Sequence, residues 1–169
     1  DLEDPERTKH YDGGVFITIY LAPHNYHRIH SMVEGEVREF SYITGDLWTV
    51  SPLGVHHVPG LFARNERLTT FLATDKGECA LVKVGATVVG RIKVCYHDLV
   101  SNRSGAKNQK IVLKIPFQVN RGEELGLFEL GSTVICLFPK GQIELGELEV
   151  EQKVYLGQAI GRFCTDSKV

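Results

Sequence analysis

The chain has 169 residues, of which 43% are hydrophobic, and this is enough for one domain with a sizeable core. Its 19 lysines and arginines stand against 21 acidic residues, and the formal net charge of -2 argues against a nucleic-acid partner or a strongly basic membrane-binding surface. No stretch approaches the roughly 20 apolar residues that span a bilayer. We therefore expect a soluble or peripheral domain whose contacts with lipid are local.

The first predicted strand is 15–20, where β-branched and aromatic residues dominate. Pro23 suits the first turn of a helix, and a short helix from Pro23 through His30 would place His27 and His30 on one face. His24 extends the spacing to three histidines. Successive steps of three drift around a helix, however, and no acidic ligand accompanies the histidines, so we predict no metal site.

A predicted short helix or tight loop follows Pro59 and Gly60 and runs through Arg67. Arg64 and Arg67 are candidates for contact with a phosphate or carboxylate, because the guanidinium fork suits such anions. The alternative is a solvated or ion-paired face, which is the commoner place for surface arginines.

The second half of the chain is rich in predicted strands, at 80–84, 87–96 and 111–119. Apolar residues occupy the odd positions of the last of these, and Pro116 places it at an edge or a bulge. In 143–150 the apolar face shifts at Gly146, as a bulge would require. Seventeen glycines and few helical periods predict a mainly β fold, a barrel or sandwich of curled sheets with a few short helices.

The pair Gly131-Ser132 lies between two apolar arms that are predicted to be buried strands. Glycine leaves the carbonyl carbon of residue 131 unshielded, and the Ser132 hydroxyl lies one residue beyond it. Given a base and an oxyanion donor, the hydroxyl can attack this carbonyl and convert the amide into an ester. β-Elimination would then cut the chain and leave dehydroalanine, which loses ammonia to water and becomes a pyruvoyl group. The structural alternative for such a pair is a turn or a bulge.

Five blocks of the sequence resemble, in the same order, those of the phosphatidylserine decarboxylases. They cover nearly the whole chain, and the processing site of that family matches Phe128 and Leu130-Gly131-Ser132-Thr133. The blocks are 20–23 with 26–30, 58–67, 84–90, 128–133 and 157–161.

The resemblance implies a self-processing enzyme with a pyruvoyl cofactor derived from Ser132. The single catalytic domain, 1–169, would then mature into a β-chain portion that ends at Gly131 and an α-chain portion that begins at position 132. The second histidine of the Tyr-His-Arg-x-His motif, His30, is implied to be the base that activates the serine, as in a serine-protease triad. The first, His27, is implied to be the acid that protonates the substrate carbon.

The implied reaction is decarboxylation of phosphatidylserine to phosphatidylethanolamine and CO2, with Arg64 and Arg67 as candidate substrate contacts and no metal ion. The implied partners are an anionic membrane surface, contacted peripherally on its cytoplasmic face, and further copies of the chain in a homo-oligomer. The triad aspartate of the family belongs to an upstream motif that neither Asp12 nor Asp46 matches. We therefore expect it outside residues 1–169, in an N-terminal part that this sequence lacks.

Two alternatives remain open. One is a decarboxylase of a related serine phospholipid. The other is a non-enzymatic β-sandwich binding module that carries a pseudo-processing site.

Overall fold

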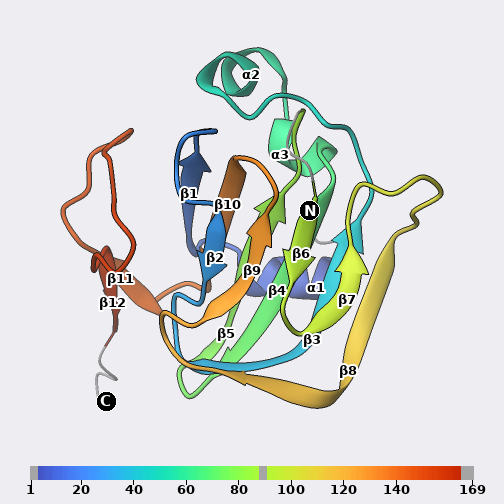
Figure 1. Cartoon of the computed structure of the whole chain (residues 1–169). Coiled ribbons are helices and arrows are strands. Elements are labelled where there is room, and N and C mark those ends of the chain that lie inside the picture. The colour runs from blue at the N-terminus through green and yellow to red at the C-terminus, as the bar shows by residue number, and fades with distance from the viewer. Residues whose placement is uncertain (1–3, 88–90, 165–169) are drawn as a thin grey trace.

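A computed structural model describes residues 4–87 and 91–164 of the chain, and antiparallel strands dominate it (Figure 1). The helices among these residues are short. The predicted fold class, mainly β with a few short helices, is confirmed.

The larger of the two main sheets has six strands in the order β1-β10-β5-β4-β3-β8. All neighbouring strands in it are antiparallel. Its two edges, β1 and β8, do not pair with each other, so the described strands form an open sheet rather than a closed barrel. The strands are β1 (Val15–Leu21), β3 (Gly35–Ile43), β4 (Arg67–Thr74), β5 (Gly77–Val84), β8 (Gln109–Val119) and β10 (Ser132–Phe138).

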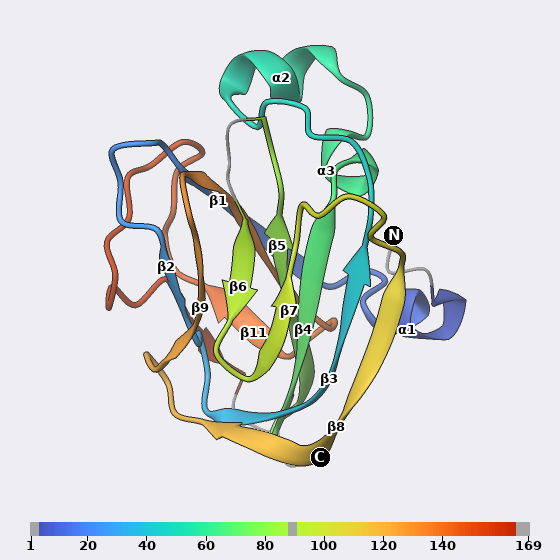
Figure 2. The ribbon, with the colours of Figure 1, turned by 45° about the vertical axis from the view of Figure 1, so that its right-hand side comes forward.

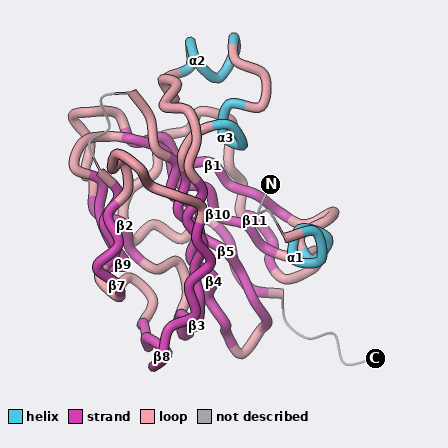
Figure 3. The backbone as a smooth tube through the Cα atoms, turned by 90° about the vertical axis from the view of Figure 1, so that its right-hand side faces the viewer, coloured by secondary structure: helices cyan, strands magenta, loops and turns pink. Residues whose placement is uncertain are grey.

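A second sheet, in the order β2-β9-β6-β7, covers one face of the first, and Figure 3 shows the two layers. Tyr96, in the turn between β6 and β7, contacts Phe40 of β3 edge to face and hydrogen-bonds Thr70 of β4. The two layers therefore share one core, as in a β-sandwich. The strands are β2 (Arg28–His30), β6 (Ile92–Val94), β7 (His97–Val100) and β9 (Glu124–Phe128), and a separate pair is formed by β11 (Ile143–Leu145) and β12 (Gly161–Phe163).

Three short helices lie outside the strands of the described chain: α1 (Pro5–His10), α2 (Pro52–His57) and α3 (Leu61–Arg64). Proline stands in the first turn of both α1 and α2, where its missing N–H costs nothing. The short helix or tight loop expected after Pro59-Gly60 and through Arg67 is the helix α3, which Gly60 precedes with a left-handed φ of 65°. It ends at Arg64, and Arg67 is already the first residue of β4. None of the described helices has the length and apolar character needed to cross a bilayer.

The helix predicted from Pro23 through His30 is wrong. Residues 22–27 form a loop in which the Ala22 N–H donates to Asn25 Oδ1 at 2.8 Å, and the chain then enters β2. β2 pairs with β9, which lies about a hundred residues later in the chain, and this ladder supplies the hydrogen bonds that a helix would have made. Local spacing carries no information about such a distant partner.

Two of the later predicted strands are shorter than expected. Of the strand predicted at 87–96, residues 88–90 lie outside the described residues, only 92–94 form a strand, β6, and residues 95–96 form the tight turn that leads to β7. The strand predicted to continue through a bulge at Gly146 instead ends at Leu145, and the Gly146 N–H donates to Ile160 O at 3.0 Å.

The edge position predicted for the strand that contains Pro116 is confirmed, because β8 is the last strand of its sheet. Its register on β3 shifts between Val37 and Glu39, which face Phe117 and Val112. The shift breaks the alternation, and Ile115 is 82% exposed.

Candidate processing and active site

The Gly131-Ser132 bond lies at the start of β10, at one end of the large sheet. Leu21, the last residue of β1, pairs with Ser132, and Val84, the last residue of β5, pairs with Thr133. Three strands therefore have their ends around the bond. This places the bond at the rim of the β core, at the same end of the molecule as α2 (Figure 1).

Gly131 packs tightly against the main chain that leaves β1. A Cβ atom at this position would lie 2.5 Å from Leu21 O, 3.0 Å from Pro23 N and 3.1 Å from the carbonyl carbon of Ala22. The first of these distances is shorter than van der Waals contact allows. The position therefore needs glycine because of this close approach of two backbone segments.

The Ser132 side chain is completely buried, and its hydroxyl donates a hydrogen bond to Val84 O. Asn65, also fully buried, braces the neighbouring residue: its Nδ2 donates to Gly85 O at 2.9 Å and to Trp48 O at 2.8 Å. The Gly85 N–H in turn donates to Glu66 O at 2.7 Å. These bonds fix the end of β5, and with it the carbonyl that holds the serine hydroxyl.

His27 lies in the loop against which Gly131 packs. Its Nε2 is 3.0 Å from Pro23 O, and because a carbonyl only accepts, Nε2 carries the proton. Its Nδ1 is buried and has no hydrogen-bond partner. The His27 carbonyl accepts from Phe128 N–H at 3.0 Å. The ring is thus held close to the segment that leads into Ser132, with one nitrogen lone pair unused.

His30 has both ring nitrogens engaged. Its Nδ1 is 2.7 Å from Gly122 O, which requires the proton on Nδ1, and its Nε2 is then the acceptor for the Tyr26 hydroxyl at 2.8 Å. The Tyr26 ring also stacks on the imidazole, with centroids 5.6 Å apart. A general base needs this tautomer, with a protonated Nδ1 held by an acceptor and an Nε2 lone pair facing a hydroxyl.

The two histidines do not share the single helical face that was predicted. His27 contacts Pro23 before β2 begins, whereas His30 ends β2 and pairs with Glu124. The structure brings His27 to the loop beside Gly131, and no hydrogen bond between described residues joins His30 to Ser132. The role of His30 toward the serine stays a prediction. Among the described residues, no three histidine, cysteine or acidic side chains gather as metal ligands would.

The two candidate arginines occupy different environments. Arg64 is half exposed, pairs with Asp46 at 2.9 Å and lies over the Trp48 ring. Hydrogen bonds from Trp48 and from Arg64 lower the pKa of Asp46 below its usual value. Arg67 is only 5% exposed, and its Nη1 donates to Ala63 O at 2.6 Å. Contact with a substrate anion stays a prediction for both, and the position of Arg64 leaves its guanidinium accessible.

Four contact residues of this site had no predicted role. Pro23 and Tyr26 lie in the sequence block 20–23 with 26–30, and Asn65 lies in the block 58–67. Their partners are main-chain and side-chain atoms that come close only in the folded chain. The fourth, Val84, acts through its carbonyl, so its side chain carries no signal in the sequence.

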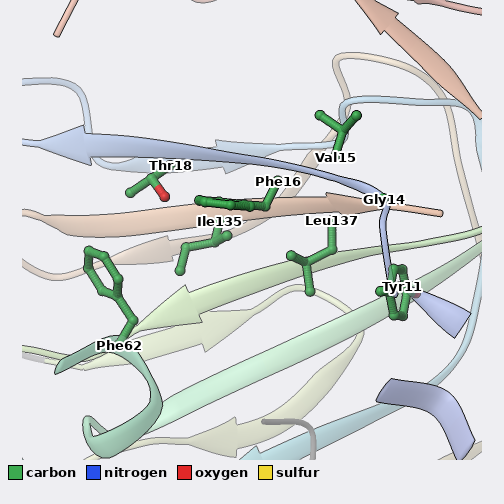
Figure 4. Close-up of a pocket in the computed structure, with 8 residues that line it drawn as sticks. All are labelled: Tyr11, Gly14, Val15, Phe16, Thr18, Phe62, Ile135 and Leu137. Atoms are coloured by element: carbon green, nitrogen blue, oxygen red, sulfur yellow. The ribbon is translucent and has the colours of Figure 1, made fainter. Parts of the chain in front are cut away.

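An apolar pocket of about 280 Å³ lies on the face of the large sheet opposite to Ser132 (Figure 4). Ile135 and Leu137 line it from β10, and they alternate with the residues that share the face of Ser132. The pocket is therefore separate from the serine. Its other lining residues are Tyr11, Gly14, Val15, Phe16, Thr18 and Phe62.

Comparison with known proteins gives one consistent result. The family model described as phosphatidylserine decarboxylase matches residues 2–162. A phosphatidylserine decarboxylase proenzyme of Brevibacillus brevis is 45% identical over 158 residues, which is 92% of this chain and 56% of the relative.

Proenzymes of the same description from Anaeromyxobacter sp. (strain K) and Myxococcus xanthus are 44% and 45% identical, over 95% of this chain in both cases, and 58% and 57% of their own lengths are covered. The chain thus spans somewhat more than half the length of these relatives. Because the family model covers nearly all of its residues, the chain belongs to the phosphatidylserine decarboxylase family.

Proposed function

We propose that the protein to which this chain belongs cuts itself between Gly131 and Ser132, converts the serine into a pyruvoyl group, and decarboxylates phosphatidylserine to phosphatidylethanolamine and CO2. The observation that carries the proposal is the Gly131-Ser132 junction itself. It combines a buried hydroxyl with a position that only glycine fits, in a chain of this family.

The cut begins when Ser132 Oγ bonds to the carbonyl carbon of Gly131 and its proton passes to a base. The C–N bond then breaks, which leaves an ester at the serine and a free amine. Loss of the α-proton and of the Gly131 carboxylate gives dehydroalanine, and water releases ammonia to leave the ketone. One domain, 1–169, would thus become portions 1–131 and 132–169.

We assign the base to His30, since its tautomer leaves Nε2 able to accept a proton from a hydroxyl. Tyr26 now occupies that nitrogen, so the assignment requires the hydroxyl of Ser132 to take the place of the hydroxyl of Tyr26. The Val84 carbonyl holds the serine until then.

The residues around position 132 fit a small ketone at the start of β10, because the site is enclosed and the unpartnered Nδ1 of His27 lies in the adjoining loop. When formed, the pyruvoyl carbonyl supplies the sink for the electrons released as CO2 leaves. We assign to His27 the protonation of the substrate carbon: its unpartnered Nδ1 must first take up a proton from solvent, which it can then donate to that carbon.

The remaining features are proposed from the same family membership. Arg64 is the exposed cation of the pair and is assigned to the anionic headgroup, with the buried Arg67, which donates to Ala63 O, holding the end of α3 that carries Arg64. The protein would act peripherally at the cytoplasmic, anionic face of a membrane, as a homo-oligomer.

Intact mass of the full-length protein tests the proposal. We expect a fragment that begins at position 132, is blocked to N-terminal sequencing, and is lighter by one ammonia than the same fragment with an N-terminal serine. The Ser132→Ala protein should remain uncut. A free serine amine on the fragment would refute the pyruvoyl mechanism, and a cut, blocked protein that leaves phosphatidylserine unchanged would refute the substrate.

A further inference from the structure

The residues 47–63, here named the cap segment, contain no aspartate, glutamate, lysine or arginine, although 24% of the chain is charged. They include α2 and three large apolar side chains that face solvent. Trp48 is 45% exposed, Leu53 69% and Val55 42%. An uncharged surface of this length with exposed apolar side chains is typical of a contact surface.

The cap segment projects beyond the end of both sheets, as Figure 2 shows for α2. It is nevertheless a packed unit rather than a loose loop. Gly54 is buried against Thr49, and a Cβ atom at Gly54 would lie 1.8 Å from Thr49 O. The helix therefore presents Leu53 and Val55 to solvent from a fixed base.

Direct hydrogen bonds tie the cap segment to the candidate site. Asn65 accepts from Trp48 N–H at 3.0 Å and donates to Trp48 O and to Gly85 O, and Gly85 follows the residue whose carbonyl holds the Ser132 hydroxyl. Next to the scissile bond, Leu130 adds another exposed apolar side chain. The apolar surface and the reacting serine thus share one end of the molecule.

The ionised side chains beside the cap segment carry a small excess of positive charge. Asp46 is paired with Arg64, and Glu129 with Lys93 at 2.6 Å. Arg91, which is exposed and whose carbonyl accepts from Glu129 N–H, adds a further cation. A surface that is uncharged at its centre, and whose border carries two ion pairs and one further cation, can approach an anionic bilayer without net repulsion.

We propose that the cap segment docks the protein on a bilayer that contains phosphatidylserine, with Trp48, Leu53 and Val55 in the interfacial layer. The inference rests on the proposed function, since it explains how a buried serine-derived group meets a headgroup that stays in its membrane. Tryptophan suits this depth because its ring is apolar and its N–H is polar.

Trp48 is the single tryptophan of the 169 residues and reports insertion directly. On addition of phosphatidylserine vesicles to the full-length protein, its fluorescence should shift to the blue and be quenched by brominated acyl chains. Subtraction of the Trp48→Phe protein removes any contribution from outside this chain. Absence of both changes in the subtracted signal would overturn the inference.

The paired variant Leu53→Ser/Val55→Ser should weaken vesicle co-sedimentation by about tenfold or more, because two apolar side chains no longer enter the interface. The matched control is Val112→Ser/Ile115→Ser, which changes two residues that are 70% and 82% exposed on β8, the edge strand farthest from β1. We expect this control to bind like the parent. Loss of binding in the β8 variant alone would place the docking surface there and refute the proposal.

Turnover separates this inference from the proposed function. The cap variant should lose activity on vesicles and keep its kcat on short-chain phosphatidylserine that dissolves as monomers. Equal loss on both substrates would show a structural effect on the site and would overturn docking as the explanation. If the parent decarboxylates neither substrate, the proposed function fails, and the fluorescence and sedimentation results still decide whether the cap segment binds membranes.

Discussion

Ser132 on β10 and Lys83 on β5 are both completely buried, and their side chains leave the large sheet on the same face. Val134 pairs with Lys83 and lies two residues from Ser132, so the alternation of strands places the three on one side. Yet the serine lies at the end of its strand, beside the loop that holds His27, while the lysine lies farther inside.

The surroundings of the two side chains differ in how far they offset the free-energy cost of burying a polar group. The Ser132 hydroxyl is neutral and bonded to a carbonyl, so its burial costs little. Lys83 Nζ donates to Thr70 Oγ1, and no ion pair of this lysine exists among the described residues. Burial lowers its pKa to about 7. Complete burial of a polar group therefore does not by itself identify a reactive site. The groups around it decide whether it can react.

The largest effects, on cleavage and on turnover, are expected from substitution of the two histidines that are assigned to the chemistry at position 132. His30→Ala should leave the chain uncut, because cleavage needs a base at Ser132 Oγ. His27→Ala should be cut but should decarboxylate about 10²-fold or more slowly, the usual loss for an acid-base group. Gel electrophoresis measures the cut, and CO2 release from labelled substrate measures turnover.

Circular dichroism of both histidine variants is the control for folding. The reverse result, an uncut His27 protein and a cut, active His30 protein, would exchange the two roles. The hydrogen bond of His27 to Pro23 would explain that outcome, because it holds His27 in the loop against which Gly131 packs.

On the lysine side, Lys83→Met should stabilise the fold, measured by urea unfolding in the uncut Ser132→Ala background. The folded-state pKa of about 7 lies below the usual 10.5, so between these values the unfolded chain binds the additional proton. The parent's free energy of unfolding therefore rises with pH across this window. At pH 7 and below, the variant should be more stable by on the order of 5 kcal/mol, and the difference should shrink toward pH 10.

The control is Lys114→Met on the exposed side of β8, which should change the free energy of unfolding by less than about 0.5 kcal/mol. Self-cleavage of Lys83→Met in the otherwise normal protein should proceed at the parent's rate. A slower cut would show that the lysine takes part in processing, and the contrast between the two buried groups would then fail.

A smaller effect, on both stability and cutting, is expected from Gly131→Ala. The added Cβ collides with Leu21 O, so the start of β10 must move, at a cost of about 1–3 kcal/mol in the free energy of unfolding. The displacement should also slow the cut. Gly146→Ala is the control, since its nearest neighbour would be Ile160 O at 3.6 Å. Equal stability of the two variants in urea would contradict the tight packing at Gly131.

The sequence was informative wherever a property is local. Alternating apolar residues and Pro116 predicted β8 as a strand at an edge or a bulge, and the apolar arms around Gly131-Ser132 predicted a strand on each side of the pair. The histidine pair was assigned to the wrong element because a three-residue spacing fits a helix, whereas the distant strand β9 decided the conformation. The burial of Lys83 could not be predicted either, because the same sequence pattern occurs when a lysine within an apolar strand is exposed at a surface.

The place of β10 in the sheet decides what would happen to the molecule after the proposed cut. This strand begins at Ser132 and is hydrogen-bonded on both sides, to β1 through seven residue pairs and to β5 through five. Self-cleavage at its start, by the route proposed above, would therefore convert an intramolecular ladder into an interface between two polypeptides that stay together as one particle. Refolding after denaturation would change from a first-order to a second-order process, with a rate that depends on protein concentration. The uncut Ser132→Ala protein would keep the concentration-independent rate.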